Sequence, residues 1–87
     1  MHKTTVTVTV DVGLHARPAS QFVQSAKRMQ SEIHLQHGEK IANAKSIIQV
    51  LSLGVNQFDE LEITAEGPDE VEAIQTLSTL IKKDFAE

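Results

Sequence analysis

Hydrophobic and polar residues alternate in several stretches of the chain, and this alternation predicts β-strands. Threonine and valine alternate from Thr4 to Val10, and apolar residues occupy every second position in Glu32–Gln36 and in Leu61–Glu66. A period of two is typical of a strand with one buried face. The turn residues His37–Gly38 lead into Glu39–Ala42, which we expect to complete a hairpin with the second strand.

Three other stretches show the pattern of helices. Apolar residues recur every three or four positions in Ala16–Met29. Ser46–Leu53 is a shorter apolar stretch that ends at Gly54, and Gly67–Pro68 lead into a third helix. The core positions expected in that last helix are Val71, Ile74, Leu77 and Ile81. The order β-α-β-β-α-β-α predicts an α/β two-layer sandwich, with helices covering one face of a sheet, in a single domain over residues 1–87.

The composition excludes several classes of protein. With 87 residues, the chain is long enough for one hydrophobic core and too short for two. It has no cysteine, which rules out disulfide bonds, a thiolate nucleophile and cysteine-bound metal. No apolar run approaches the roughly 20 residues that a membrane-spanning helix needs. The first residues also lack a secretory pattern, so we expect a soluble protein of the cytoplasm.

Charge is distributed unevenly along the chain, whose net charge is −4. Residues 1–55 carry six basic and three acidic side chains, whereas residues 56–87 carry two basic and nine acidic ones. The chain has three phenylalanines, no tyrosine, no tryptophan and only two arginines. Nucleic-acid binders usually combine a dense basic patch with stacking aromatics, so we expect no direct nucleic-acid partner. An acidic protein docking on the basic half fits the charge pattern better.

The stretch Gly13–Ser20 is the most informative, because it places a histidine at a helix start. His15 falls at the expected N-cap, and Pro18 falls in the first turn, where a missing N–H costs little. The amides of Ala16 and Arg17, with the Arg17 guanidinium, then form an anion site that suits phosphate. The positive end of the helix dipole disfavours imidazolium, so we expect a neutral ring able to attack phosphorus. Taken alone, these residues also fit a histidine that only caps the helix.

The other three histidines give no indication of a metal site. His2 lies near the N-terminus, and His34 and His37 occupy a predicted strand and its turn, with no third ligand close in sequence. We expect all three at the surface and no bound metal.

Ser46, at the start of the second helix, has two interpretations. Ser46 and Gln49 match the capping box, in which both side chains satisfy backbone N–H groups. The serine also suits regulatory phosphorylation, because a phosphate there would meet the positive helix end and add charge to the surrounding surface. This short helix carries too many apolar residues to face one core, so some should be exposed to a protein partner. The five are Ile47, Ile48, Val50, Leu51 and Leu53.

Taken together, these motifs resemble the HPr family, the histidine-containing phosphocarriers of the bacterial phosphoenolpyruvate:sugar phosphotransferase system (PTS). The resemblance rests on Gly13–Ala19, Lys45–Ile47 and Leu53–Val55, and it extends over essentially the whole chain. The Ser46 helix is similar to that of low-GC Gram-positive members. The resemblance implies an open-faced β-sandwich, in which a four-stranded antiparallel sheet is covered on one face by three helices.

The resemblance also implies a role for each motif. His15 would accept a phosphoryl group at Nδ1 from phospho-Enzyme I and pass it to a sugar-specific IIA component, as a carrier that needs no cofactor and is not an enzyme. Arg17 would contact the phosphoryl group. Ser46 would be phosphorylated by the HPr kinase/phosphorylase, and the product would serve as corepressor of the catabolite-control transcription regulator. Partner proteins would dock on Ser20, Ile47, Ile48 and Leu51. We expect a monomer with no membrane insertion.

The chain departs from the Gram-positive pattern within the second helix. Ile48 and Leu51 stand where many members carry methionine, and Gln49 stands where they carry glycine. Branched aliphatic side chains are stiffer than methionine and adapt less to a partner.

Two other functions fit the residues. One is a regulatory module centred on Ser46, as in the related Crh proteins, which keep the serine but lack the active histidine. The other is a small enzyme that uses His15 as a general base. Phosphorylation of Ser46 without that of His15 would favour the first, and turnover of a small molecule would favour the second.

Overall fold

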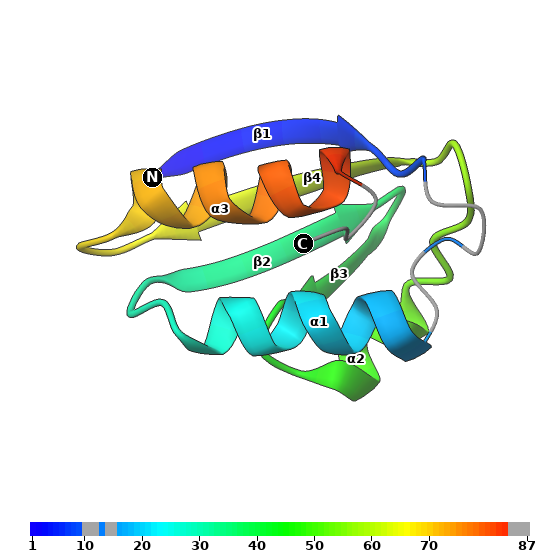
Figure 1. Ribbon diagram of the computed structural model, residues 1–87, viewed down its shortest axis with the longest axis horizontal. Helices are drawn as coiled ribbons and strands as arrows, with labels where there is room; N and C mark the ends of the chain where they lie inside the picture. Colours follow the sequence, from blue (N-terminus) through cyan, green and yellow to red (C-terminus); the bar gives the residue numbers. More distant parts are fainter. Residues whose placement is uncertain (10–12, 14–15, 84–87) are drawn as a thin grey trace.

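Four strands and three helices make up the structure (Figure 1), a computed structural model that describes residues 1–9, 13 and 16–83. The strands are β1 (His2–Thr7), β2 (Glu32–His37), β3 (Lys40–Asn43) and β4 (Glu60–Glu66), and the helices are α1 (Ala16–Lys27), α2 (Ile47–Ser52) and α3 (Glu70–Lys82). Their order confirms the predicted sequence of elements, β-α-β-β-α-β-α.

The strands form an antiparallel sheet in the order β1-β4-β2-β3. Strand β4 lies between β1 and β2, so that Leu61 pairs with Val6 on one side and Ile63 pairs with Leu35 on the other. The β2–β3 pair is the expected hairpin. Because successive side chains of a strand point to opposite faces, the sheet has one apolar and one polar face.

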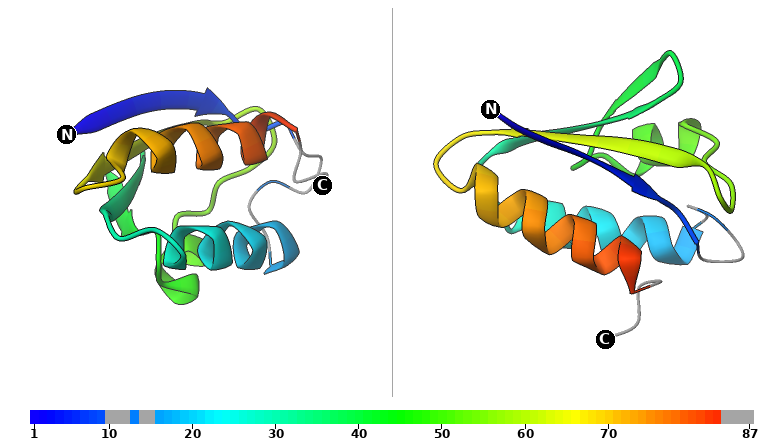
Figure 2. Two further views of the ribbon diagram at one scale, coloured as in Figure 1. Left: turned by 60° about the vertical axis from the view of Figure 1, so that its left-hand side comes forward. Right: turned by 90° about the horizontal axis from the view of Figure 1, so that it is seen from above.

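Helices α1 and α3 lie along the apolar face of the sheet, and the opposite face is open (Figure 2). Helix α2 is shorter and packs against α1 and β3. The core fills the space between the helices and the sheet, and its burial supplies the main driving force for folding. Its largest fully buried side chains include Phe22, Ile33, Leu35, Leu61, Ile63, Leu77 and Ile81. This arrangement confirms the predicted open two-layer sandwich.

Two elements end earlier than the sequence predicts. Strand β1 ends at Thr7 rather than at Val10, and α1 ends at Lys27 rather than at Met29. The amide of Met29 donates to the carbonyl three residues earlier, at 3.0 Å. This is the tighter spacing of a 3-10 turn, which often closes a helix. Val10 lies outside the described residues.

The prediction that Val71 belongs to the core stripe of α3 is wrong, because its side chain is 46% exposed. The other three predicted positions are buried, together with Ala73. At about 100° of rotation per residue, Val71 lies on the flank of the arc that these buried residues define.

Asp69 ties the start of α3 to the turn before β2. Its carboxylate accepts the backbone N–H groups of Gln30 and Ser31, each at 2.9 Å, and also the Ser31 hydroxyl. Gly67 packs on the same serine, since a Cβ there would come within 2.7 Å of the Ser31 Cα. Asp69 occupies the N-cap of α3, as an acidic helix start suggests, yet its side chain makes no hydrogen bond to that helix. It stabilises the tertiary fold instead.

This contact predicts a loss of stability in acid. The hydrogen bond from the Ser31 hydroxyl, followed by that from the Gln30 amide, holds the pKa of Asp69 below its usual value. A carboxyl with a lowered pKa stabilises the fold above its unfolded-state pKa, and that contribution is lost as pH falls. We expect the urea midpoint of unfolding to fall from about pH 5 towards pH 2, and to fall less in Asp69→Asn.

The matched control is Glu72→Gln, which removes an exposed acid from the first turn of the same helix. It should keep the acid sensitivity of the unchanged protein. The same pH dependence in Asp69→Asn and in the unchanged protein would contradict the assignment.

Candidate functional site

The start of α1 carries the groups that the sequence marks as an anion site. Ala16 and Arg17 are exposed, whereas Pro18 is buried against the core. The first N–H groups of a helix have no acceptor within the helix, so they can bind a ligand. Arg17 forms no ion pair with any residue that the structure describes. His15 lies outside the described residues, and its place at the N-cap stays a prediction.

Gly13 contacts the segment between α2 and β4, which we call the 54–59 loop. The φ angle of Gly13 is 64°, in the left-handed region that favours glycine. A Cβ at this position would lie 2.5 Å from the carbonyl oxygen of Val55 and 2.8 Å from the Cα of Asn56. Only glycine allows so close an approach. Along the sequence, this contact lies two residues before His15.

His37, the last residue of β2, holds the 54–59 loop. Its Nδ1 lies 3.0 Å from the carbonyl oxygen of Leu53, and its Nε2 lies 3.1 Å from Oδ2 of Asp59. Its side chain is only 25% exposed, so the prediction of a plain surface residue is wrong for His37, whereas His34 and His2 are exposed as expected. The two contacts span 16 and 22 residues, and no local pattern indicates them.

Ser46 caps α2, but only half of the predicted capping box forms. Its hydroxyl accepts the N–H of Gln49 at 3.4 Å, a long hydrogen bond. The Gln49 side chain instead accepts the N–H of Asn43, at 2.8 Å. The neighbouring Lys45 donates from Nζ to the Met29 carbonyl at 2.8 Å, just beyond the end of α1. Modification of the Ser46 hydroxyl would therefore displace only one weak hydrogen bond.

Helix α2 presents an exposed apolar patch, as its surplus of apolar residues predicts. We define this apolar patch as Ile47, Ile48 and Leu51, which are 37%, 74% and 41% exposed. The other two apolar residues of the stretch, Val50 and Leu53, are buried. Helix α2 packs beside α1 (Figure 1), on which Ser20 is half-buried. The predicted docking residues thus lie on two adjacent helices.

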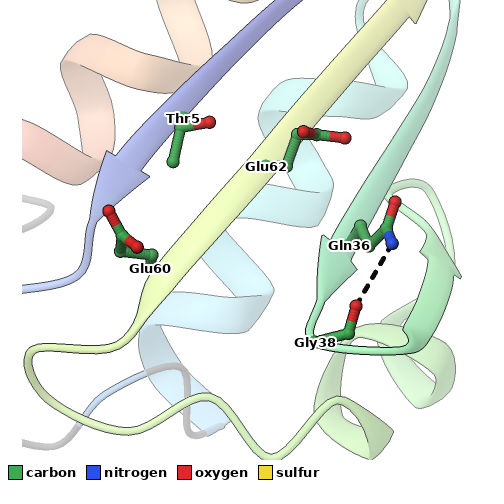
Figure 3. A pocket seen from close by; sticks show the side chains of 5 residues that line it. All are labelled: Thr5, Gln36, Gly38, Glu60 and Glu62. Carbon is green, nitrogen blue, oxygen red and sulfur yellow. Dashed lines mark hydrogen bonds between the residues drawn. The ribbon is translucent and has the colours of Figure 1, made fainter.

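Acidic residues are absent from two stretches of the chain that contain α1 and α2. Residues 16–31 and 40–58, which include α1 and α2, contain no acidic residue and carry Arg17, Lys27, Arg28, Lys40 and Lys45. On the open face, a shallow hollow is lined by Thr5, Gln36, Gly38, Glu60 and Glu62 (Figure 3). The two carboxylates there repel a phosphoryl group, so the hollow is a poor candidate for binding one.

Neither a metal centre nor a membrane span is found in the part of the chain that the structure describes. No three histidine, aspartate or glutamate side chains among residues 1–9, 13 and 16–83 are grouped so that they could hold a metal ion. The helices formed by these residues are too short or too polar to cross a bilayer.

Comparison with known proteins places these features in a family. Residues 2–83 match the family described as the PTS HPr component phosphorylation site. The structure is similar to HPr-C-His from Thermoanaerobacter tengcongensis, with a TM-score of 0.97 and 45% identity, covering 100% of this chain and 98% of that one. It is similar to the phosphocarrier protein HPr from Bacillus anthracis str. Ames, with a TM-score of 0.89 and 38% identity, covering 92% and 95%.

A third similar structure is Crh, a Bacillus subtilis catabolite repression protein described as a domain-swapped dimer. Its TM-score is 0.78 and its identity 38%, and the match covers 100% of both chains.

The fold, the helix-start motif and these matches define the class of protein as a phosphocarrier of the phosphotransferase system. The chain belongs to the HPr family and is of the Gram-positive type, which confirms the resemblance seen in the sequence.

Proposed function

We propose that this protein accepts a phosphoryl group on His15 from phospho-Enzyme I and passes it to sugar-specific IIA components for sugar uptake. The family match over residues 2–83 is the observation that carries this proposal. The exposed start of α1 supports it, because free amides and a guanidinium without an ion pair among the described residues suit a phosphoryl group. The protein acts as a carrier within one domain over residues 1–87, not as an enzyme.

The transfer step needs only groups of the two proteins. Nδ1 of a neutral His15 attacks the phosphorus atom, and a P–N bond forms while the bond from phosphorus to the donor breaks. The electron pair of the broken bond stays with the donor. The amides of Ala16 and Arg17 and the Arg17 guanidinium bind the phosphoryl oxygens and stabilise the charge that they carry. No cofactor is required, because the P–N bond itself retains the transfer potential.

Docking uses the helical side of the molecule. The apolar patch and Ser20 provide the contact, and Arg17 and Lys27 of α1, with Lys45 just before α2, attract an acidic partner. A small patch with charge steering gives fast association and weak binding, which suits a carrier with several partners. We expect it to act as a monomer in the cytoplasm.

Ser46 is the regulatory site in this proposal. The HPr kinase/phosphorylase modifies its hydroxyl, and the new negative charge next to the apolar patch repels an acidic Enzyme I surface. The same charge provides a recognition point for the catabolite-control transcription regulator. The similarity to Crh supports this second role, since Crh is named for catabolite repression.

The direct test is the intact mass of the protein after incubation with phosphoenolpyruvate and an Enzyme I that is competent on another carrier. We expect one added acid-labile phosphoryl group, and none in His15→Ala. An unmodified protein would reject the carrier function and leave the regulatory module centred on Ser46.

A further inference from the structure

The ring of His37 bridges two segments of the chain. Nδ1 faces the carbonyl of Leu53, at the C-terminal end of α2, and Nε2 faces the carboxylate of Asp59, just before β4. The ring and the carboxylate are both partly buried, with side-chain exposures of 25% and 34%. We call this pair of contacts the histidine bridge.

The histidine bridge is complete in only one protonation state of the ring. A carbonyl oxygen and a carboxylate are both acceptors, so each ring nitrogen must carry a proton to donate to its partner. A neutral ring carries one proton and loses one of the two hydrogen bonds. Two other charged residues lie near His37 in the fold. Lys40 pairs with His37 on β3, and Glu60, which follows Asp59, lies on the open face of the sheet. Asp59 is thus the charged partner within hydrogen-bond distance.

Asp59 transmits the constraint to the 54–59 loop. The oxygen that faces His37 also accepts the N–H of Asn56 at 2.9 Å, and the Asp59 N–H donates to the Asn56 carbonyl at 3.1 Å. The Asp59 carbonyl in turn accepts the N–H of Val8 at 2.9 Å. Asn56 is therefore held between Asp59 and Gly13. Because Gly13 has no side chain, the backbone of Val55 and Asn56 can pack directly against it. A continuous set of contacts runs from His37 to Gly13.

We propose that His37 is a positioning residue for phosphoryl transfer, and that its protonated ring fixes the 54–59 loop against Gly13. The inference rests on the proposed function, because it treats the segment before His15 as part of the phosphoryl site. When the ring loses a proton, the hold on Asp59 weakens and the loop is less constrained. Transfer then slows for a reason separate from the chemistry of the accepting histidine.

The first test follows backbone amide signals by NMR between pH 5 and pH 8, in His15→Ala so that the accepting histidine does not contribute. We expect the amides of Asn56 and Gly13 to titrate with the same midpoint as the His37 ring, and this response to vanish in His37→Gln. His34→Gln, which changes an exposed histidine of the same strand, should leave it intact. If the amide signals of Asn56 and Gly13 did not change together with the His37 ring, the proposed role of the histidine bridge would be wrong. This outcome does not depend on the function of the protein.

The second test measures the rate of phosphorylation by Enzyme I. We expect His37→Gln to be slower than the unchanged protein by roughly 2- to 30-fold at low pH, and the ratio to shrink as pH rises. A ratio independent of pH would mean a merely structural role and would reject the inference. An unchanged protein that is never phosphorylated would reject the proposed function instead, and the NMR titration would still decide the bridge.

Discussion

Gly13→Ala is expected to lower the free energy of unfolding by about 2–5 kcal/mol. Alanine at a φ of 64° adds about 1–2 kcal/mol of backbone strain. Its Cβ, 2.5 Å from the Val55 carbonyl oxygen, would displace the 54–59 loop and add about 1–3 kcal/mol of overpacking. Urea unfolding measures the sum. We also expect slower phosphorylation of His15, because the displaced loop contacts the segment before it.

Gly38→Ala provides a matched control for this prediction. The φ of Gly38 is 63°, almost the same as that of Gly13, but a Cβ there would meet nothing within 4 Å. It should carry only the backbone strain of about 1–2 kcal/mol and leave phosphorylation unchanged. Equal destabilisation by the two substitutions would mean that the contact between Gly13 and the 54–59 loop has no energetic weight.

Ile48→Asp is expected to slow phosphoryl acceptance from Enzyme I by about tenfold or more, while stability changes little. Ile48 is 74% exposed, so folding buries little of its surface. Docking would bury it, and an aspartate there removes apolar contact and repels an acidic partner. A combined loss of about 1.4 kcal/mol in the docked state corresponds to a tenfold change in rate. Rapid-quench measurement of phosphoryl transfer gives the rate, and thermal unfolding gives the stability.

Ile41→Asp is the corresponding control, since Ile41 is 65% exposed but lies on β3, where it pairs with Gln36 of the open face. It introduces the same charge and removes the same side chain on the strand that α2 packs against, outside the three residues of the apolar patch. The transfer rate should stay within twofold of the unchanged protein, by comparison with the small effect of ordinary surface substitutions. If both substitutions slowed transfer alike, overall charge rather than the apolar patch would account for the result.

The helices and strands could be predicted from the sequence because apolar residues recur with a regular spacing in each of them. Alternation around Ile33 and Leu35 identifies β2, and the spacing of Phe22 and Val23 identifies the buried side of α1. The excess of apolar residues on α2 also predicts exposure, because a two-turn helix has only one buried side. The HPr resemblance adds the expected roles of His15 and Ser46. Local patterns alone do not decide whether these residues cap their helices or carry phosphate.

The long-range contacts that hold the fold and the segments around the site could not be predicted in the same way. Asp69 satisfies the amide of Ser31, and His37 reaches Asp59, in each case across more than twenty residues of sequence. Gly13 indicates a turn in the sequence, but the sequence does not show that the backbone of Val55 and Asn56 packs against it. Such pairs depend on how the sheet and the helices pack together. The exposure of Val71 depends on packing too, because a small rotation of its helix changes it from buried to exposed.

Under the proposed function, docking through the apolar patch on α2, which packs beside α1, has a kinetic consequence. Donor and acceptor proteins that both recognise this side of the molecule cannot occupy it together, so the two half-reactions follow each other and never form a ternary complex. Each delivery then requires complete release and a new encounter. The time that the carrier stays bound to each partner then limits the rate of phosphoryl delivery. A substitution that tightened docking would slow this delivery.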